Sequence, residues 1–192
     1  MCDLCFGSIS ISFFLQTLIA LATHTLHIVV GVTFKMYSGE VELPVLMCNR
    51  HPEVVVPCYA TEGDSGLDVQ ADILSPVTLN PGERELIPCG VKFDIPQGYE
   101  IQVRPRSGLA HKHGISIVNA PGTVDMGYRG EIKINLINHG QMPVTILPAQ
   151  KIAQLVIAPV FRAKITKTDT LSETERGENG YGSTGTHHPS RS

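Results

Sequence analysis

Hydrophobic and polar residues alternate with a period of two along much of the chain. In the segment YEIQVRP, Ile101 and Val103 are apolar, whereas the residues between and beside them are polar. Successive side chains of a strand point to opposite faces, so this pattern predicts a strand with one buried face. The segment EIKINLIN repeats the pattern with Ile132, Ile134 and Leu136.

Shorter apolar runs predict further strands in EVVVP, GISIV and QLVIAPV, and the turn-forming segments NPGE, PQG, APG and NHG lie between them. Many short strands separated by turns are typical of a sandwich or jelly roll. SGLAHKH, residues 107–113, is the one segment that suggests a helical turn, with Ser107 as its N-cap. We therefore expect an all-β, jelly-roll-like sandwich or barrel with one short helix.

The first 35 residues follow a different pattern. From Leu4 to Phe34 there is no Asp, Glu, Lys or Arg, a length that could span a membrane. Asp3 stands where a signal peptide carries basic residues, and no clear cleavage site follows. We expect that translation naturally begins at Met36 and that residues 1–35 are an upstream extension. A membrane anchor is the alternative.

The other end of the chain is polar and rich in Gly and Ser from about Leu171, which predicts a flexible C-terminal arm over 172–192. Gly180, Gly182 and Gly185 in this arm have the G-x-G-x-x-G spacing of a dinucleotide-binding turn. That motif requires a preceding strand, a following helix and a later acid, and the sequence offers none of them. The arm is therefore not a dinucleotide site. Between the two ends, residues 36–171 are expected to form the β domain.

Composition excludes some functions. A net charge of −3 argues against a general nucleic-acid binder, which carries a basic surface. The five cysteines include a CDLC motif, but no second Cys or His pair stands at zinc-site spacing. Free thiols point to a reducing compartment, and we expect a cytoplasmic protein.

Four stretches are polar where a strand protein has no structural need of polarity. In ATEGDSGLDVQA, Asp68 enters a strand, where such a residue usually caps a turn. In RPRSGLAHKHG, Arg106, Ser107 and the Gly108 amide meet at the start of the expected helix. Unpaired N–H groups at a helix start favour an anion, so this stretch is a candidate phosphate site.

The other two stretches lie later in the chain. NAPGTVDMGYRGE places Asn119, Asp125 and Tyr128 around an expected glycine-rich hairpin. ILPAQKIAQLVIAPV carries Gln154 in an otherwise apolar strand. A buried Gln must find hydrogen-bond partners, so Gln154 is either a structural bridge or a ligand contact.

Taken together and in this order, PRSGLAHKHGI, GTVDMGYRGE, KIAQL and RGENGYGSTG resemble the motifs of the trimeric dUTPases. The resemblance extends from about Met36 to Thr186. It implies hydrolysis of dUTP to dUMP and pyrophosphate by attack of water on the α-phosphorus, with Mg²⁺ as cofactor. It also implies a homotrimer with active sites at subunit interfaces. The reaction would keep uracil out of DNA and supply dUMP for dTMP synthesis.

The resemblance implies roles for the residues of the third motif. Asp125 is expected to orient the nucleophilic water and to hold the 3′-hydroxyl. Tyr128 is expected to pack under the deoxyribose and to leave no space for a 2′-hydroxyl. Asn119 is expected to recognise uracil. Further substrate contacts are expected from four neighbours: Gly122, Thr123, Val124 and Lys133.

The other motifs imply contacts to the triphosphate. Arg106, Ser107 and Gly108 match the phosphate-binding second motif, and Gln154 matches a phosphate contact of the fourth. Asp68 matches the acid of the first motif, which is expected to act on Mg²⁺ through water, while substrate phosphates hold most of the ion. The arm is expected to close over the substrate as a lid, with five contact residues: Arg176, Tyr181, Gly182, Ser183 and Thr184.

Departures from the family pattern are small. Lys151 stands where the family often has Arg, and Tyr181 stands where it mostly has Phe. His111 and His113 resemble general bases in type, but the family gives them no such role, and we expect surface or helix-packing histidines.

Two alternative functions use the same scaffold. The dCTP deaminases carry a catalytic Glu in the strand that corresponds to KINLIN, where this chain has Asn135. Without that carboxylate, proton transfer to the cytosine amine lacks its agent. A non-catalytic, nucleotide-responsive binding protein is the second alternative. The presence of Asp125, Arg176 and Tyr181 argues against a loss of activity.

Overall fold

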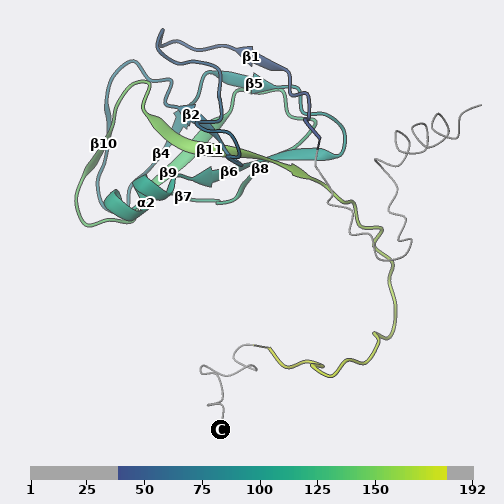
Figure 1. Ribbon diagram of the computed structural model, residues 1–192. Helices are drawn as coiled ribbons and strands as arrows, with labels where there is room; N and C mark the ends of the chain where they lie inside the picture. The colour runs from purple at the N-terminus through teal and green to yellow at the C-terminus, as the bar shows by residue number, and fades with distance from the viewer. Residues whose placement is uncertain (1–38, 181–192) are drawn as a thin grey trace, which may run out of the picture. The chain divides into compact units, whose positions relative to one another are not determined.

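Short β-strands and one helix make up the folded part of the chain in the computed structural model, which describes residues 39–180 (Figure 1). The chain divides into two units, Met1–Val41 and Glu42–Ser192, and every element named here belongs to the second. The elements are β1 Val45–Met47, β2 Leu67–Gln70, β3 Val77–Leu79, β4 Arg84–Pro88, β5 Val91–Phe93, β6 Tyr99–Pro105, α2 Ser107–His113, β7 Ile115–Ile117, β8 Gly122–Val124, β9 Lys133–Asn138, β10 Val144–Ile146 and β11 Lys151–Pro159.

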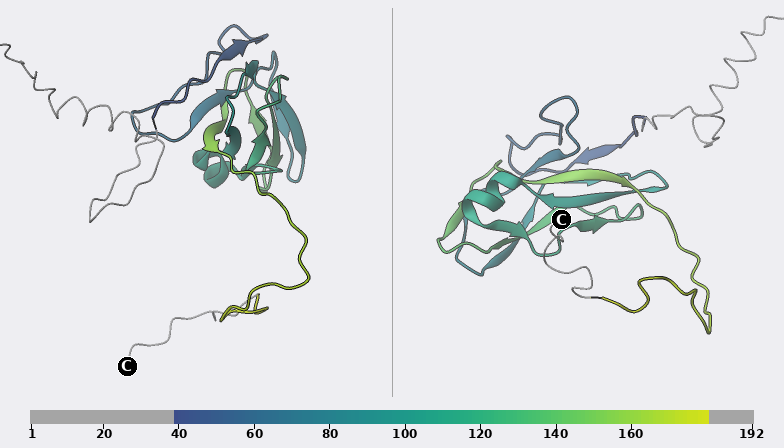
Figure 2. Two further views of the ribbon diagram at one scale, coloured as in Figure 1. Left: turned by 90° about the vertical axis from the view of Figure 1, so that its right-hand side faces the viewer. Right: turned by 60° about the horizontal axis from the view of Figure 1, so that its bottom comes forward.

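The strands pair antiparallel in two larger sheets and two smaller pairs. One sheet has the order β2-β11-β6-β8 and the other has the order β4-β9-β7. The pairs are β1 with β5 and β3 with β10. The two longest strands, β6 and β11, lie side by side and form the centre of the four-stranded sheet (Figure 2).

A single core lies between the two larger sheets. Ile101 and Leu155 of the four-stranded sheet belong to the same buried cluster as Ile134 and Leu136 of the three-stranded sheet. Each sheet therefore turns one face to the core, as the period-two patterns of β6 and β9 predict. For residues 39–180, the predicted all-β sandwich with one short helix is confirmed.

The prediction of a strand in EVVVP, residues 53–57, is wrong. Residues 54–57 form no strand, and Val54 is the one valine of this run that is buried. Val55 and Val56 are exposed, and the Val55 N–H donates to the Gln70 side chain at 3.0 Å instead of to a neighbouring strand. This run of β-branched residues therefore does not pair with a neighbouring strand.

The helix α2 occupies the predicted segment, but its cap differs from the prediction. Arg106 is the N-cap, in an extended conformation and without a side-chain cap hydrogen bond, and Ser107 is the first helical residue. The prediction of Ser107 as N-cap is wrong. The helix ends at His113, and its C-cap Gly114 has a φ of 71°, a left-handed conformation that glycine adopts without strain.

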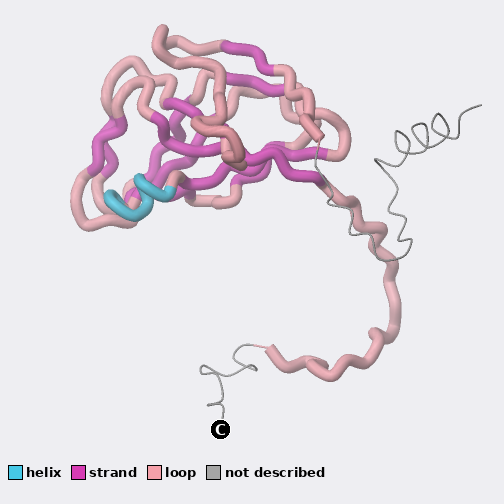
Figure 3. The backbone as a smooth tube through the Cα atoms, viewed as in Figure 1, coloured by secondary structure: helices cyan, strands magenta, loops and turns pink. Residues whose placement is uncertain are grey.

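Residues 160–180, beyond β11, contain no helix or strand, and each of them is exposed (Figure 3). The predicted N-terminal extension, 1–35, and the predicted contact residues Tyr181, Gly182, Ser183 and Thr184 lie outside the described residues. No helix among residues 39–180 is long and apolar enough to cross a membrane.

Candidate active site

Three strands bring the first, second and fourth motifs together. Asp68 of β2 lies opposite Gln154 of β11, and Gln154 lies opposite Arg104 of β6. Arg106 follows directly after β6, at the start of α2. The antiparallel register of the four-stranded sheet therefore places side chains from residues 68, 106 and 154 in one region, although they are distant in sequence.

The carboxylate of Asp68 lies between two cations. Its Oδ1 is 3.0 Å from the Arg106 Nε and its Oδ2 is 2.9 Å from the Lys151 Nζ. The Asp68 side chain is 14% exposed, whereas those of Arg106 and Lys151 are 35% and 43% exposed. One carboxylate thus holds two partly exposed cations in place, and the cluster has an excess of positive charge.

A surface cavity of about 510 Å³ opens beside this cluster. Its lining includes Asp68 and Gln154, the loop 64–66, and the first residues of α2, Ser107 and Gly108. The first N–H groups of a helix have no partner within the helix and are suited to an anion. The structure therefore brings together the residues predicted for phosphate binding, in a cavity lined by two cations, Arg106 and Lys112, and two carboxylates, Asp64 and Asp68.

Gln154 makes a structural contact while it lines the cavity. Its Nε2 donates to the Pro105 carbonyl at 2.9 Å, which links β11 to the end of β6. Its Oε1 lies against Gly66, where a Cβ atom would overlap it. The side chain is therefore a bridge whose position requires glycine at 66.

Asp64 borders the same cavity as a turn cap. Its carboxylate accepts hydrogen bonds from the Thr61 hydroxyl at 2.7 Å and the Thr61 N–H at 2.8 Å. These two donors lower the pKa of the Asp64 carboxyl below its usual value. The group therefore stays ionised to a lower pH than an ordinary aspartate.

The residues of the third motif lie on a different part of the domain. β8 pairs with β6, with Thr123 opposite Gln102 and Gly122 opposite Val103. A Cβ atom at Gly122 would lie 3.1 Å from the Asn119 Nδ2, so glycine allows the Asn119 amide to pack closely against β8. The side chain of Val124 is buried in the core, and β8 is an edge strand of its sheet.

The expected hairpin in this region is not present. β8 pairs with β6, whereas β9 pairs with β4 and β7, so residues 125–132 cross from one sheet to the other. The crossing begins with a turn in which the Tyr128 N–H donates to the Asp125 carbonyl at 3.0 Å. Because β8 and β9 belong to different sheets, they do not pair with each other as the two strands of a hairpin would.

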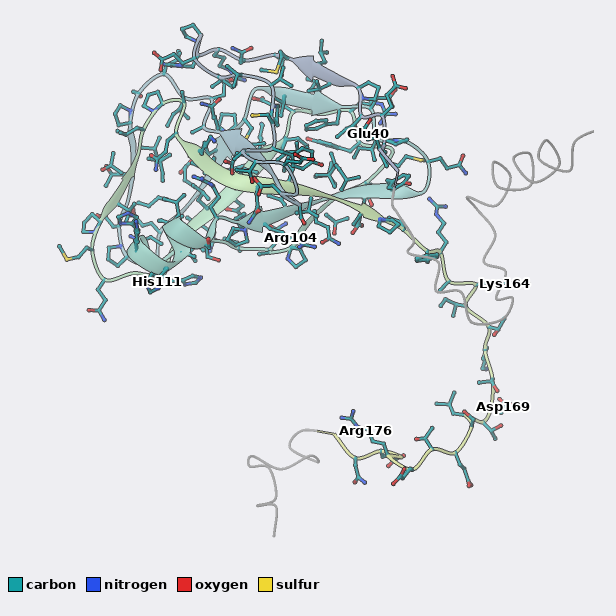
Figure 4. The ribbon with its side chains drawn as sticks, in the orientation of Figure 1. Glu40, Arg104, His111, Lys164, Asp169 and Arg176 are labelled. Atoms are coloured by element: carbon teal, nitrogen blue, oxygen red, sulfur yellow. The ribbon has the colours of Figure 1, made fainter. Side chains whose placement is uncertain are left out.

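Within one chain, the predicted site residues fall into two groups. Asn119, Thr123, Asp125, Tyr128 and Lys133 are not among the residues that line the cavity beside Asp68. Arg176 is exposed on the segment after β11, where its Nε donates to the Asn179 carbonyl at 2.9 Å (Figure 4).

Comparison with known proteins decides the family. The sequence model of the dUTPase family matches residues 52–185. The chain belongs to the dUTPase family. A deoxyuridine 5′-triphosphate nucleotidohydrolase of an Anaeromyxobacter species is 54% identical over 136 residues, which cover 71% of this chain and 91% of that protein. The corresponding protein of Chlamydia felis is 51% identical over 143 residues, or 73% of this chain and 97% of that protein.

A solved structure agrees with the sequence relatives. The dUTPase of Staphylococcus bacteriophage 80alpha, in a mutant form with dUpNHpp, is similar with a TM-score of 0.68 and 26% sequence identity. The match covers 76% of this chain and 99% of that chain. The fold of this dUTPase is therefore that of the family.

The described part of this dUTPase contains no group of three or more His, Cys, Asp or Glu side chains that could hold a metal ion. Both oxygens of Asp68 are already paired with cations, so direct ligation of a metal would break an ion pair. His111 is exposed on α2 (Figure 4). His113, at the end of the same helix, is also exposed and lines the cavity beside Asp68.

Sequence reasoning missed a buried charged cluster. Asp72, just after β2, is 1% exposed and accepts hydrogen bonds from Arg50, which also contacts Glu131. The signal in the sequence is weak: an aspartate in the short run QADI, at a position where the strand pattern has ended. Its partners are distant in sequence, so no local pattern reveals them.

Proposed function

We propose that this chain hydrolyses dUTP to dUMP and pyrophosphate by attack of water on the α-phosphorus, with Mg²⁺ as cofactor. The observation that carries the proposal is its 54% identity to a deoxyuridine 5′-triphosphate nucleotidohydrolase over 91% of that protein. The structure supports it with a cavity in which Arg106 and the start of α2 are suited to a polyphosphate, and with a separate turn suited to a nucleoside.

The cavity beside α2 is the proposed triphosphate site. The guanidinium of Arg106 can present two parallel N–H groups to phosphate oxygens, and Lys151 adds a compact positive charge. Ser107 and Gly108 contribute main-chain donors, and Gln154 lines the wall. Because these groups are held in place before substrate arrives, they stabilise charge that develops on the phosphates without rearranging.

The turn after β8 is the proposed nucleoside site. The Asp125 carboxylate orients the attacking water and holds the 3′-hydroxyl of the sugar. Tyr128 packs against the deoxyribose and occupies the space that a 2′-hydroxyl would need. The Asn119 amide recognises the uracil edge, with main-chain contacts from two strands: Gly122, Thr123 and Val124 of β8, and Lys133 of β9.

The separation of these two groups in one chain supports a homotrimer with shared active sites. We infer that Asp125 and its turn come from one subunit and Arg106 from a neighbour. The third subunit contributes the arm, in which Arg176 contacts the terminal phosphate and Tyr181 covers the base. Exposed apolar residues on the outer face of the β4-β9-β7 sheet, Leu86 and Val118, are available to be buried between subunits. Gly182, Ser183 and Thr184 complete the arm's contacts.

The residues of the cavity fit Mg²⁺ only if the protein contacts the ion through water. Two carboxylates line the cavity. That of Asp64 caps the turn at Thr61, and the oxygens of Asp68 are already paired with Arg106 and Lys151. Mg²⁺ retains several waters and binds largely through substrate phosphates, so Asp68 is proposed to reach it through water. When bound, the ion neutralises triphosphate charge.

The setting proposed for this reaction is the cytoplasm. Cys48, Cys58 and Cys89 are free thiols in the structure, which suits a reducing compartment. There the enzyme would keep uracil out of DNA and supply dUMP for dTMP synthesis. A role in binding nucleic acid is not proposed, because the chain has a net charge of −3.

Pyrophosphate release tests the proposal. The purified full chain is incubated with Mg²⁺ and each of dUTP, dCTP and dTTP, and pyrophosphate and ammonia are measured. We expect far more pyrophosphate to be released from dUTP than from dCTP or dTTP. Ammonia from dCTP would favour a deaminase, and binding of dUTP without any turnover would favour the non-catalytic alternative.

A further inference from the structure

A chain of polar contacts joins a buried carboxylate to the hydroxyl of Tyr128. It begins at Asp72, which is 1% exposed. The Asp72 Oδ1 accepts the main-chain N–H groups of Arg50 and His51, each at 2.8 Å. The Asp72 Oδ2 accepts the Arg50 Nη1 at 3.1 Å. The backbone and the side chain of Arg50 are thus held by one buried anion.

The guanidinium of Arg50 also contacts Glu131 at two points. Its Nη1 is 3.2 Å from the Glu131 Oε1 and its Nη2 is 3.3 Å from the Oε2. The Gly90 N–H donates to the same Oε1 at 3.0 Å. A two-point contact between a planar guanidinium and a carboxylate fixes orientation as well as distance. Arg50 and the Gly90 N–H therefore fix the Glu131 carboxylate together.

The segments that carry these groups are packed closely. Gly90 has a φ of 67°, and a Cβ atom there would lie 2.6 Å from the Asn49 Cβ and 3.1 Å from the Asp72 Cγ. On the other side of Glu131, the Ile132 N–H donates to the Val91 carbonyl at 2.9 Å. Arg50 and Glu131 thus have little room to shift while these contacts hold.

Glu131 in turn determines the position of the Tyr128 phenol. The Tyr128 hydroxyl donates to the Glu131 main-chain carbonyl at 2.9 Å. The ring lies over Gly130, where a Cβ atom would overlap it. Because Tyr128 is held at its hydroxyl by Glu131, a displacement of Glu131 moves the ring.

A second tether holds the same turn from outside. Arg129 forms an ion pair with Asp94, and the two side chains are 55% and 64% exposed. Arg129 also donates to the Met126 and Tyr128 carbonyls. An ion pair in which both side chains are exposed contributes little.

The Arg50 side chain, at 53%, is about as exposed as that of Arg129, but its partners Asp72 and Glu131 are only 0% and 12% exposed. Among the described residues, Arg50 is the only side-chain cation within ion-pair distance of Asp72 or Glu131. The inner tether through Arg50 is therefore anchored on two largely buried carboxylates, whereas the outer tether is anchored on an exposed one.

We propose that Arg50 is a positioning residue for sugar selection, acting through Glu131 on Tyr128. This inference rests on the proposed function, in which Tyr128 excludes a 2′-hydroxyl. With Arg50 in place, the phenol is held where a ribose would collide with it. Without Arg50, the Glu131 segment gains freedom, the phenol can yield, and UTP is accepted more readily relative to dUTP.

The test compares kcat/KM for dUTP and UTP in wild type and in Arg50→Met. We expect the ratio of dUTP to UTP to fall about tenfold or more, because displacements of an ångström can change rates by up to about a hundredfold. Glu131→Gln keeps the main-chain carbonyl but weakens the contact to Arg50, and its ratio is expected to fall too. In the double variant, the ratio of dUTP to UTP is expected to be no lower than in the more affected single variant, because both changes break the same contact.

Asn138→Ala is the matched control for lost stability. Asn138 is fully buried at the far end of β9, and its Nδ2 donates to the Leu79 and Met142 carbonyls at 2.9 and 2.8 Å. Its replacement is expected to lower the unfolding temperature and to leave the dUTP to UTP ratio unchanged. If Asn138→Ala lowers the ratio as much as Arg50→Met does, the inference is overturned.

Arg50→Lys covers the case in which Arg50→Met does not fold. Lysine keeps the charge beside Asp72 but cannot contact both oxygens of Glu131, so a lower ratio is again expected. An unchanged ratio in every folded Arg50 variant, with an active wild type, would overturn the inference. A wild type that turns over no dUTP would instead defeat the proposed function.

Discussion

The carboxylate of Asp68 and the guanidinium of Arg106 form an ion pair with 3.0 Å between the Oδ1 and the Nε. The pair joins β2 to the start of α2. The Arg106 Nη1 also donates to the Lys151 carbonyl at 3.2 Å. The first motif of this dUTPase thus acts on the second through a direct contact.

Asp68→Asn is expected to weaken substrate binding more than it weakens the fold. Asparagine keeps the shape but loses the charge that holds Arg106 and Lys151, so both cations lose their fixed position. We expect kcat/KM for dUTP to fall by about tenfold to a hundredfold, measured by pyrophosphate release. Glu83→Gln, a change at a turn cap on Asn80 away from the cavity, serves as control and should keep wild-type kinetics. Unchanged kinetics in Asp68→Asn would show that the ion pairs are not needed for binding.

Asp125→Asn is expected to abolish turnover while dUTP still binds. Loss of the carboxylate removes the group that orients and activates the water, a contribution of about 10² to 10⁴ in rate. Calorimetric titration with dUTP, alongside the pyrophosphate assay, separates binding from chemistry. Turnover close to that of wild type would refute the role given to Asp125.

Deletion of residues 172–192 is expected to leave a folded trimer with severely reduced activity. The described part of the arm is exposed and contains no helix or strand, so the core does not depend on it. Its loss removes Arg176 and Tyr181 from the substrate and admits water to the site. Circular dichroism and analytical ultracentrifugation report fold and assembly. An unfolded or monomeric product would mean that the arm is structural.

The three described thiols are expected to react at different rates. Burial raises the pKa of the Cys89 thiol, and nearby Glu131 and Asp72 add to the effect. The reactive thiolate is therefore scarce at Cys89, whereas Cys58 is exposed. Alkylation of the native protein near pH 8, followed by peptide mass spectrometry, should modify Cys58 first and Cys89 only after unfolding. Early modification of Cys89 would contradict its placement in the core.

Parts of the fold that bury one face of a strand were predictable from the sequence. Apolar and polar residues alternate along β6 and β9 because Ile101 and Ile134 face the core while their neighbours do not. EVVVP misled because its valines favour a strand, yet the backbone there bonds to the Gln70 side chain. The N-cap was misassigned because Ser107 has the typical residue type, while the chain enters the helix one residue earlier.

The candidate site was predictable as a set of residues but not as an arrangement. The motif residues themselves identify Asp68, Arg106 and Gln154, and the sheet register brings them together. The contact of Arg50 with Glu131 joins residues 81 positions apart, and that of Arg50 with Asp72 joins residues 22 positions apart. Such pairings leave no local pattern, so only the folded structure shows them.

Mixing of inactive subunits tests the central claim most directly, namely that the two groups of residues act on dUTP across subunits. Arg106→Ala lacks the phosphate side of the site and Asp125→Asn lacks the nucleoside side, so each homotrimer is expected to be inactive. Unfolded together and refolded, the two variants should regain about a quarter of wild-type pyrophosphate release, the share of sites that random assortment repairs. A mixture as inactive as its components would contradict the claim.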